Sequence, residues 1–521
     1  MTVEAPARGA AIGTPSEPRR WSWTWLFVAG VLAIGFVLRF WTRSDLWLDE
    51  ALSINIARLP LSDLHAALRH DGAPPLYYLL LHFWIQAFGI GDLATRSLSG
   101  LISLATLPLA WFAGRRLGGR RVAWFTVLVL AVSPYAVLYA TSTRMYALVM
   151  LLALAGYLAV IRAVERPSPT RLAVVALVTA LLVYTQYWCF YLVGVAGLLL
   201  LTQAVRAGSG ETRRAAVRNL VAVAVGLVTF IPWVPTFLYQ ARHTGTPWGN
   251  ARVPWSSIAE AILHFAGSDQ NGETFILLFA LVTLVVLAVF GRGVDERVIE
   301  FDLRTQPGVR REAVLTVGTL LVGTTASFAA GSAFDARYAS VMYPFYVLLV
   351  AVGISLFLAP RVRAAVLAVV VAIGIVGGIR DVTTNRTQAA QSTSIIAAEA
   401  RPGDVVAYCP DQIGPSASRL LRDIPGLVQL TFPDGAAPDR VNWVDYINRI
   451  QAASPQAFAN RVLARAGTHA IWFVNALGYN HVEGKCEAIG TALIRSRPNA
   501  AQRVVQDDSI DEYMGLTVYR S

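Results

Sequence analysis

The chain has 521 residues, of which 55% are hydrophobic and 15% charged, and its mean hydropathy is +0.51. Soluble domains do not carry such an apolar load, and repeated apolar runs of about 18–22 residues predict a polytopic α-helical membrane protein. The net charge is +11, but the arginines that supply it cluster between apolar runs rather than in a basic domain with interleaved aromatics, so nucleic acid is not an expected partner.

Residues 1–20 are polar, and the first apolar run starts only after Arg20. We therefore predict a disordered cytoplasmic tail here rather than a signal peptide. Residues 21–380 are the predicted transmembrane domain, because runs long enough to cross a bilayer follow one another through it. The expected spans, about eleven, are 22–42, 97–114, 122–140, 146–164, 172–187, 189–205, 219–238, 274–291, 313–330, 339–358 and 364–380.

A further apolar run, 74–90, is ambiguous. If it crossed the membrane, three arginine clusters between later spans would face outward; if it does not, they face the cytoplasm together with Arg19 and Arg20. The positive-inside rule favours the second arrangement, in which 74–90 lies at the outer interface and the arginines contact lipid head groups. The N-terminus is then cytoplasmic, and the outward-facing parts are 43–96, 141–145, 187–189, 239–273, 331–338 and 381–521.

Residues 381–521 are polar and lack long apolar runs. Short strand-like runs alternate there with helix-like stretches, which predicts a small extracytoplasmic α/β domain. Strands are expected at 405–408, 426–430, 470–474 and 516–519, and helices at 415–422, 455–466 and 486–496. Cys409 and Cys486 both fall in this region, and we expect them to pair in a disulfide if it lies outside the cytoplasm.

The loop after the first span, residues 44–78, carries an unusual set of ionisable side chains for so apolar a chain. They are Asp49, Glu50, His70 and Asp71. Acids beside a membrane are costly unless they face water, a metal or a ligand, so we interpret this loop as the reaction centre. There Asp49 would act as a general base toward a hydroxyl, and Glu50 would orient it. The alternative is that both acids only charge the first turn of a helix, where negative charge is stabilising.

His70 and Asp71 also allow two interpretations. They bind sugar hydroxyls or a metal, or they end one helix just before a Pro-Pro pair begins the next. A bound divalent cation is a further interpretation of this loop, because carboxylate oxygens are suitable ligands for such an ion. The candidate ligands are Asp49, Glu50 and Asp71.

Three arginines fall near the outer ends of predicted spans, on the same face as this loop. They are Arg96, Arg144 and Arg337. A guanidinium offers a fork of donors that suits phosphate, so each is a candidate ligand for a donor phosphate. The alternatives are extension to lipid head groups and, for Arg337, pairing with Asp335. Tyr338 is placed with Arg337, whereas Tyr146 and Tyr187 would contact substrate or anchor the protein at the interface.

Several common motifs are missing from the sequence. We find no GxxxxGK[ST], no GxGxxG after a strand, no HExxH and no nucleophile elbow. Nucleotide-driven chemistry is therefore unsupported. The predicted spans carry few polar residues and no pair of matched broken helices, which weakens a transporter or flippase as the alternative function.

The order of these features resembles the C-type (GT-C) superfamily of membrane glycosyltransferases. The likeness is closest to its protein mannosyltransferase and lipid A aminoarabinose transferase branch, as in actinobacterial mannosyltransferase-like proteins. It is carried by Asp49-Glu50 after the first span, the His-Asp-Gly-Ala-Pro-Pro run from His70, Arg96 at the next span, and Arg337-Tyr338 late in the domain. It covers roughly residues 20–380 and is best between 40 and 150.

This resemblance implies an inverting glycosyltransferase at the outer face of the plasma membrane, with a polyprenyl-phosphate-linked sugar as donor. Asp49 takes the role of catalytic base, Glu50 assists, and Arg96, Arg144 and Arg337 become ligands of the donor phosphate. The Arg-rich, Lys-poor composition suits a high-GC actinobacterium, so mannose or arabinose is the expected sugar and a cell-envelope glycolipid or polysaccharide the expected acceptor. The alternatives are a flippase or transporter of lipid-linked glycans and a protein O-mannosyltransferase.

Overall fold

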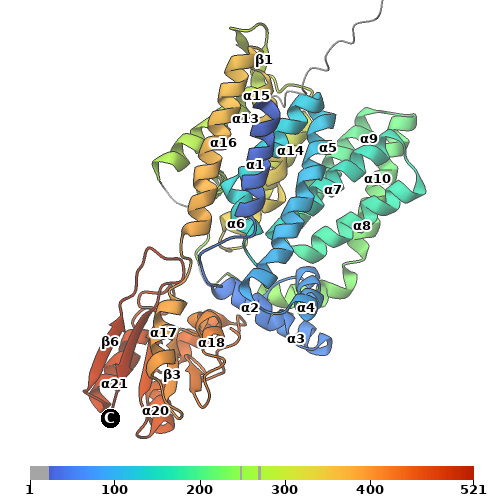
Figure 1. The fold of residues 1–521 in the computed structure, drawn as a ribbon. Helices are drawn as coiled ribbons and strands as arrows, with labels where there is room; N and C mark the ends of the chain where they lie inside the picture. The colour runs from blue at the N-terminus through green and yellow to red at the C-terminus, as the bar shows by residue number, and fades with distance from the viewer. Residues whose placement is uncertain (1–22, 247–248, 268–270) are drawn as a thin grey trace, which may run out of the picture.

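The computed structural model describes residues 23–246, 249–267 and 271–521, so the predicted tail 1–20 lies outside the described residues. A bundle of long helices is joined at one end to a smaller α/β domain (Figure 1). Short helices lie at the end of the bundle that faces this domain: α2 (Leu48–Ala57), α3 (Leu61–Asp71), α4 (Leu76–Phe88) and α11 (Val234–His243).

The bundle is built from the apolar stretches of the chain. Its helices are α1 (Trp23–Leu38), α5 (Asp92–Val132), α6 (Pro134–Ala140), α7 (Tyr146–Glu165), α8 (Pro169–Thr185), α9 (Cys189–Arg206), α10 (Glu211–Val228), α12 (Pro254–Ala266), α13 (Gly272–Phe290), α14 (Arg310–Ala329), α15 (Tyr343–Ser355) and α16 (Pro360–Thr383). A short hairpin, β1 (Gly291–Gly293) and β2 (Ile299–Phe301), closes the end farthest from the α/β domain (Figure 1).

The predicted fold class is confirmed. Among the described residues, seven segments are long and apolar enough to cross a membrane: α5, α7, α9, α10 with α11, α13, α14 and α16. The segment α5 holds two of the predicted spans, because its backbone leaves helical geometry at Gly118 and Gly119. With the shorter apolar helices α1, α8 and α15, these segments follow the predicted spans in order along the chain.

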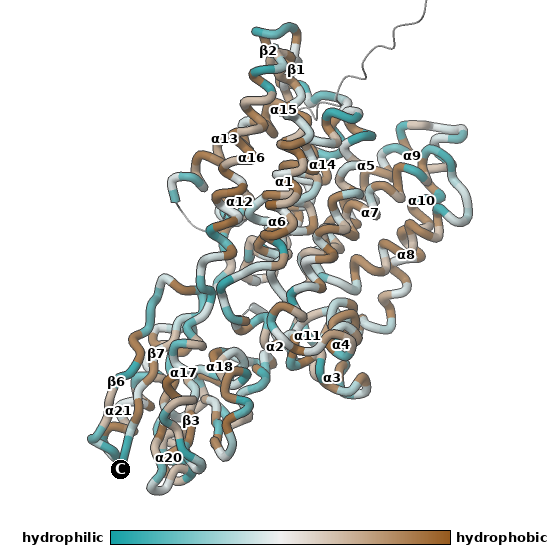
Figure 2. Tube along the Cα trace, viewed as in Figure 1, coloured by the Kyte–Doolittle hydropathy of each residue, from teal (hydrophilic) through white to brown (hydrophobic). Residues whose placement is uncertain are grey.

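Exposed apolar side chains cover the outside of the bundle. Phe279 is 77% exposed, Val205 71% and Val317 61%. Figure 2 shows hydrophobic residues along the whole length of the bundle helices, whereas the connections at their ends are more polar. Such a surface is stable against acyl chains but not against water, so this chain is a multi-pass membrane protein.

The ambiguous apolar run forms α4, which has 13 residues. A helix of that length measures about 20 Å, well short of the ~30 Å hydrocarbon core of a bilayer. It lies beside α2 and α3 at the end of the bundle (Figure 1). This placement agrees with the interface helix that the distribution of arginines predicts.

Close helix packing holds the bundle together. The central helix α5 packs against α1, α7, α15 and α16. Elsewhere α15 lies directly on the backbone of α13: a Cβ atom at Gly353 would stand 2.1 Å from the carbonyl oxygen of Leu284. Only glycine allows that approach, and small residues at such crossings are a usual means of packing helices in membranes.

The tail forms a five-stranded mixed sheet with the order β4-β3-β5-β7-β6. Its strands are β3 (Val405–Cys409), β4 (Val428–Thr431), β5 (Ile471–Asn475), β6 (Ala500–Val504) and β7 (Gly515–Tyr519). Strand β3 pairs in parallel with β4 and β5, whereas β7 runs antiparallel to β5 and β6. The α/β prediction is therefore correct in type, and four of the strands lie at or within two residues of the expected positions.

Helices cover both faces of this sheet. They are α17 (Ala389–Glu399), α18 (Gly414–Leu420), α19 (Tyr446–Ala452), α20 (Pro455–Ala466) and α21 (Lys485–Ser496). Every residue of β3 is buried, because Val406 and Tyr408 face the cluster with α17 and α18 while Val405 and Ala407 face the one with α20. The sequence did not predict β6, a polar edge strand, or α17 and α19.

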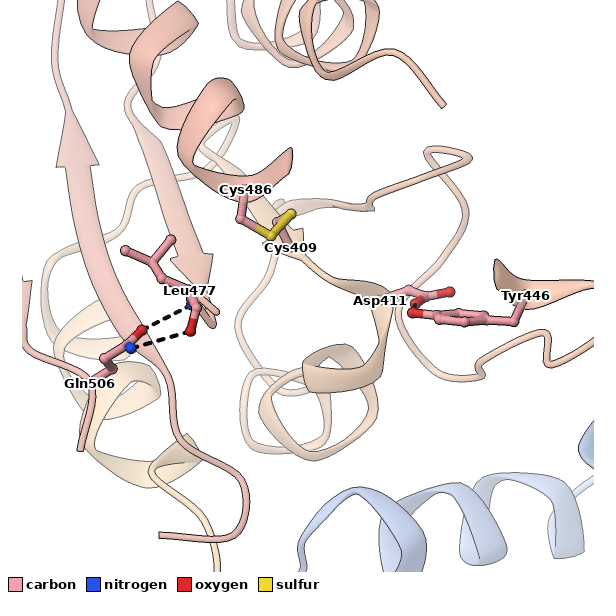
Figure 3. The surroundings of a disulfide bond; sticks show 6 residues. All are labelled: Cys409, Asp411, Tyr446, Leu477, Cys486 and Gln506. Carbon is pink, nitrogen blue, oxygen red and sulfur yellow. Dashed lines mark hydrogen bonds between the residues drawn. A yellow bond between two sulfur atoms is a disulfide. The ribbon is translucent and has the colours of Figure 1, made fainter. Parts of the chain in front are cut away.

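Cys409 ends β3 and Cys486 stands near the start of α21, and the two are joined by a disulfide (Figure 3). The bond ties the sheet to the helix that covers it. Nearby, the hydroxyl of Tyr446 donates to Asp411 at 2.6 Å, which links α19 to the segment after β3. The disulfide, being covalent, also stabilises the small domain by restricting its unfolded chain.

Candidate functional site

The helix α2 carries two neighbouring acids that point to different partners. Asp49 and Glu50 are its second and third residues, and the side chain of the preceding residue, Trp47, does not cap the helix. Successive helical residues are rotated by about 100°, so the two carboxylates leave the helix in different directions. Asp49 faces Arg337 and Arg144. Glu50 faces Arg96.

Asp49 lies in a cluster of charges drawn from three parts of the chain. Arg337, in the 3-10 helix η2 (Ala336–Val341), donates from Nη1 to Asp49 Oδ2. Arg144, in the turn before α7, brings its Nε to 3.8 Å from the same oxygen. Asp335 pairs with Arg337, with Oδ2 3.0 Å from Nε. These side chains keep between 14% and 35% of their surface exposed, so none of them is fully closed off from solvent.

Electrostatics keep Asp49 ionised. Burial by itself would raise the pKa of this carboxyl group, but the charges of Arg144 and Arg337 outweigh burial and lower the pKa. The cluster therefore combines a carboxylate able to accept a proton with two guanidinium groups able to bind an anion. The geometry places both functions within a few ångströms of each other.

Arg144 is held from the opposite side by α2 and α4. Its Nη1 donates to Ser53 Oγ at 3.0 Å and lies 3.5 Å from the hydroxyl of Tyr78. Tyr78 in turn donates to Asp71 Oδ2 at 2.7 Å. Burial raises the pKa of Asp71, although the charge of Arg144 opposes this shift. Asp71 is thus connected to the cluster through one tyrosine.

Two tyrosines flank the arginines. The Cζ atom of Arg144 lies 5.9 Å from the ring centre of Tyr146, and that of Arg337 lies 5.9 Å from the ring centre of Tyr338. Both distances fall within cation–π range. Tyr338 also stacks on Trp188, with ring centres 5.7 Å apart. Aromatic surface therefore borders the charged cluster.

Glu50 and Arg96 form a separate, closed pair. Arg96 donates from Nε to Oε1 at 2.8 Å and from Nη2 to Oε2 at 2.6 Å, and the side chains are 0% and 5% exposed. Glu50 also accepts the N–H of Thr143 at 2.8 Å. Arg96 donates further to the carbonyls of Ser44 and Asp45 at 2.7 and 3.0 Å. The guanidinium of Arg96 thus donates to several acceptors within the protein. This indicates a positioning role rather than the expected contact with a donor phosphate.

His70 and Tyr187 make contacts elsewhere. The side chain of His70 is exposed near the end of α3, and its carbonyl accepts the N–H of Trp443 at 3.2 Å. Tyr187 donates to Gln240 and accepts from Trp233 Nε1 at 3.1 Å. The structure therefore does not bring these two predicted substrate ligands to Asp49 through any contact described.

Within the described ranges, no group of three or more His, Cys, Asp or Glu side chains is placed to hold a metal ion. The physical reason is visible for the candidates. Asp49 and Glu50 diverge toward different arginines, and Asp71 is bonded to Tyr78. In this region the positive charge comes from guanidinium groups.

Two tail residues that contact α2 and the segment before it were not predicted from the sequence. Glu512 accepts the N–H of Leu48, and the N–H of Arg386 donates to Ser44 Oγ. Arg386 stands just after the last predicted span, which was the one signal available for it. Glu512 lies in a polar stretch without a motif, so nothing in the sequence distinguished it.

Comparisons relate the chain to known proteins. Residues 72–235 match the family described as dolichyl-phosphate-mannose-protein mannosyltransferase. No curated protein sequence matches the chain. The apo structure of ArnT from Cupriavidus metallidurans is 14% identical with a TM-score of 0.58, covering 95% of this chain and 97% of that one. The structure of the same protein bound to undecaprenyl phosphate is 15% identical with a TM-score of 0.58, covering 95% and 98%. The likeness spans bundle and tail and shows a shared fold.

Proposed function

We propose that this chain is a GT-C membrane glycosyltransferase that transfers a sugar from a polyprenyl-phosphate donor to an acceptor hydroxyl. The observation that carries the proposal is the ion cluster of Asp49 with Arg337 and Arg144. The matched family is named for dolichyl-phosphate-mannose, and one ArnT structure holds undecaprenyl phosphate. Both compounds are polyprenyl phosphates, and by analogy we assign this chain the same donor class.

In this proposal the α2 end of the bundle faces outward. Arginines gather at the other end, where Arg116, Arg162, Arg166 and Arg171 line one cavity beside the α7–α8 connection. The positive-inside rule assigns such an end to the cytoplasm. The N-terminus is then cytoplasmic and the tail extracytoplasmic. Nucleotide sugars are confined to the cytoplasm, so a lipid phosphate must deliver the activated sugar to this face.

The reaction is a single displacement. Asp49 accepts the proton of the acceptor hydroxyl while the hydroxyl oxygen attacks the anomeric carbon. The bond between that carbon and the phosphate oxygen breaks, and its electron pair leaves with the polyprenyl phosphate. The anomeric configuration is inverted. Negative charge grows on the leaving phosphate, where Arg144 and Arg337 stabilise it, with Tyr146 and Tyr338 beside them.

The two arginines link donor binding to the strength of the base. In this structure both face Asp49 and hold its pKa low. A donor phosphate competes for the same guanidinium groups, whose donors match its oxygens. As the arginines turn toward phosphate, Asp49 loses countercharge and its pKa rises. The carboxylate thus becomes a stronger base when a donor is in place.

Glu50 and Arg96 take a different role from the one the resemblance implied. Their buried pair joins α2 to α5 and to the turn that carries Arg144. We assign them as positioning residues that keep Asp49 and Arg144 at a fixed separation. Asp71, held by Tyr78 next to Arg144, is the acid left to contact a sugar hydroxyl.

Mannose or arabinose is the proposed sugar, and a cell-envelope glycolipid or polysaccharide the proposed acceptor. Protein mannosyltransferases carry a larger domain between late spans, whereas the longest later outer segment here is 239–273. The match to a protein mannosyltransferase family over 72–235 keeps a protein hydroxyl as the alternative acceptor.

Transfer by the purified full chain tests the proposal directly. The chain is incubated with radiolabelled polyprenyl-phosphate mannose or arabinose and a membrane extract, and labelled product is measured. Asp49→Asn keeps the shape of the side chain but removes the base, so transfer should fall by about 10²–10⁴-fold. Asp63→Asn, at an exposed acid on the neighbouring α3, is the matched control and should keep full activity.

Two outcomes would contradict the proposal. Full transfer by Asp49→Asn would remove Asp49 from the reaction. Movement of lipid-linked sugar across the bilayer with no transfer to any acceptor would identify a flippase instead.

A further inference from the structure

The tail domain reaches α2 through a buried carboxyl group. Glu512, in the segment before β7, is 1% exposed. Its Oε2 accepts the N–H of Leu48 at 3.2 Å, and its Oε1 accepts from Ser416 Oγ at 2.6 Å. The backbone N–H of Glu512 donates to the carbonyl of Arg386 at 2.9 Å. Both the side chain and the backbone of Glu512 are therefore fixed.

This contact falls on the residue before Asp49. Leu48 is the first residue of α2, so its N–H is one of the donors that have no partner within the helix. Such donors are usually satisfied by a side chain just before the helix, but α2 has no side-chain cap of that kind. Glu512 supplies the missing acceptor from a separate domain.

A second buried tail residue, Arg386, supports the other part of the cluster. It is 5% exposed and donates three hydrogen bonds to hydroxyl groups of the membrane domain. The acceptors are Ser44 Oγ at 2.9 Å, Ser142 Oγ at 3.0 Å and Thr141 Oγ1 at 3.1 Å. The two later acceptors lie in the turn that leads directly into Arg144. The tail thus contacts the chain just before Asp49 and just before Arg144.

We propose that the tail domain completes the reaction centre, with Glu512 and Arg386 as positioning residues for Asp49 and Arg144. The inference rests on the proposed function, because it takes Asp49 as the base. Neither tail residue touches the substrate. Each acts through hydrogen bonds, Glu512 on the start of α2 and Arg386 on the turn before α7.

Other contacts dock the tail independently of Glu512. Arg419 donates to Asp92 Oδ1 at 2.8 Å, and Asn55 Nδ2 donates to the carbonyl of Asp439 at 2.7 Å. The helix α18 also packs on α2. The domain should therefore stay in place when Glu512 is changed. Arg419 serves as a matched control, since it is a tail side chain that binds the membrane domain at the start of α5 rather than at α2.

The test compares three variants of the full chain in the transfer assay: Glu512→Ala, Glu512→Gln and Arg419→Ala. Burial raises the pKa of Glu512 to about 8, so glutamine reproduces its shape, its neutral form and its acceptor for Leu48. Glu512→Ala should lower kcat by about 10- to 100-fold at a nearly constant donor KM, because a misplacement of about 1 Å has that effect. Glu512→Gln and Arg419→Ala should keep kcat within about threefold of the unmodified chain, because neither change should misplace Asp49.

Amide hydrogen exchange over residues 44–53 provides a readout that needs no activity. Glu512→Ala should increase exchange there, and the other two variants should not. If Glu512→Ala does not fold, Glu512→Asp, shorter by one methylene, is measured in its place with the same expectation.

Each result decides one statement. The inference is overturned if Glu512→Ala leaves kcat and exchange unchanged, if Glu512→Gln is as impaired as Glu512→Ala, or if Arg419→Ala has the same effect. Absence of transfer from every polyprenyl-phosphate sugar by the unmodified chain would overturn the proposed function instead. Exchange over residues 44–53 would then still decide whether Glu512 positions α2.

Discussion

Two acid–arginine sites stand side by side in this protein, and they differ in how completely they are closed. In the Glu50–Arg96 pair, both carboxylate oxygens are bonded, the acid is 0% exposed, and further protein acceptors surround the guanidinium. In the Asp49 cluster, two arginines meet near one carboxylate oxygen, and the side chains stay partly exposed. A closed pair fixes geometry, whereas an open one can exchange partners with a ligand.

Position on a helix alone does not explain the difference. Asp49 and Glu50 are consecutive in α2, and both have a pKa lowered by arginines against the effect of burial. The carboxyl group of Glu512, buried close by, accepts from Leu48 and Ser416 rather than from a guanidinium, and its pKa is raised. The three acids therefore have three different roles in our proposals: Asp49 is the base, Glu50 a structural anchor and Glu512 a neutral hydrogen-bond acceptor.

The largest expected effect is a loss of folding stability when the closed Glu50–Arg96 pair is disrupted. Glu50→Gln removes the carboxylate that pairs with the buried guanidinium of Arg96, which should cost about 3–5 kcal/mol of unfolding free energy. Asp49→Asn should cost less than about 1 kcal/mol, because its arginines are part-exposed and one keeps Asp335 as partner. Denaturation of the purified variants in one detergent measures both.

The double variant Glu50→Gln/Arg96→Met is the control for this prediction. Removing both charges takes away the unpaired ion, so part of the lost stability should return. Equal losses in Asp49→Asn and Glu50→Gln would show that the two sites do not differ in the way their exposure indicates.

The next largest effect is on activity, at the open cluster. Arg337→Gln removes one of the two cations that we propose bind the leaving phosphate, and transfer should fall by about 10²–10³-fold. It also removes countercharge from Asp49, so the pKa of that acid should rise. In the proposed reaction, activity needs ionised Asp49 and is lost as the pH falls through its pKa, so the acid limb of kcat/KM should move up by about one pH unit or more.

Arg252→Gln is the matched control, because Arg252 is an exposed arginine paired with Glu260. It should change neither the rate nor the pH profile. An acid limb that stays in place in Arg337→Gln would mean that Asp49 is not the group that titrates.

A smaller expected effect is the pH dependence of folding stability that arises from Glu512. Its pKa is about 8 in the folded chain against an ordinary 4.5, because burial raises it and the charge of Asp49 adds to this, while bonds from Ser416 and Thr387 oppose it. Between those values the folded state holds a proton that the unfolded state has lost. Stability from this group is full below about pH 4.5 and is lost as pH rises through 8.

The unmodified chain should therefore lose more thermal stability than Glu512→Gln between pH 6 and pH 9, by about 2–4 °C in melting temperature. Asp411, whose burial raises its pKa to about 7, contributes a slope of the same sign to both chains. The difference between the two melting curves isolates Glu512. Parallel curves would contradict the raised pKa.

The fold and part of the site could be predicted from the sequence, for physical reasons. Apolar runs encode spans directly, and counting spans placed Asp49, Arg144 and Arg337 on one face, where the structure brings them together. The partner of Arg96 was out of reach, because it depends on the direction in which Glu50 leaves α2. Glu512 was out of reach for a different reason: its contact exists only once the tail domain has docked on the bundle.

The smallest expected effect tests whether an arginine of the open cluster exchanges a carboxylate partner for a ligand. Asp335 pairs with Arg337 and competes with any phosphate for it, but its Oδ1 also accepts the N–H of Arg337 and so caps η2. Asp335→Asn keeps an oxygen for the cap and removes the competing charge. Donor affinity should therefore improve by about two- to fivefold, the value of one part-exposed ion pair, with kcat little changed. Donor KM from initial rates measures it. A rise in KM would mean that Asp335 holds Arg337 in the orientation that binds phosphate, and that the two carboxylates around this arginine cooperate rather than compete with the ligand.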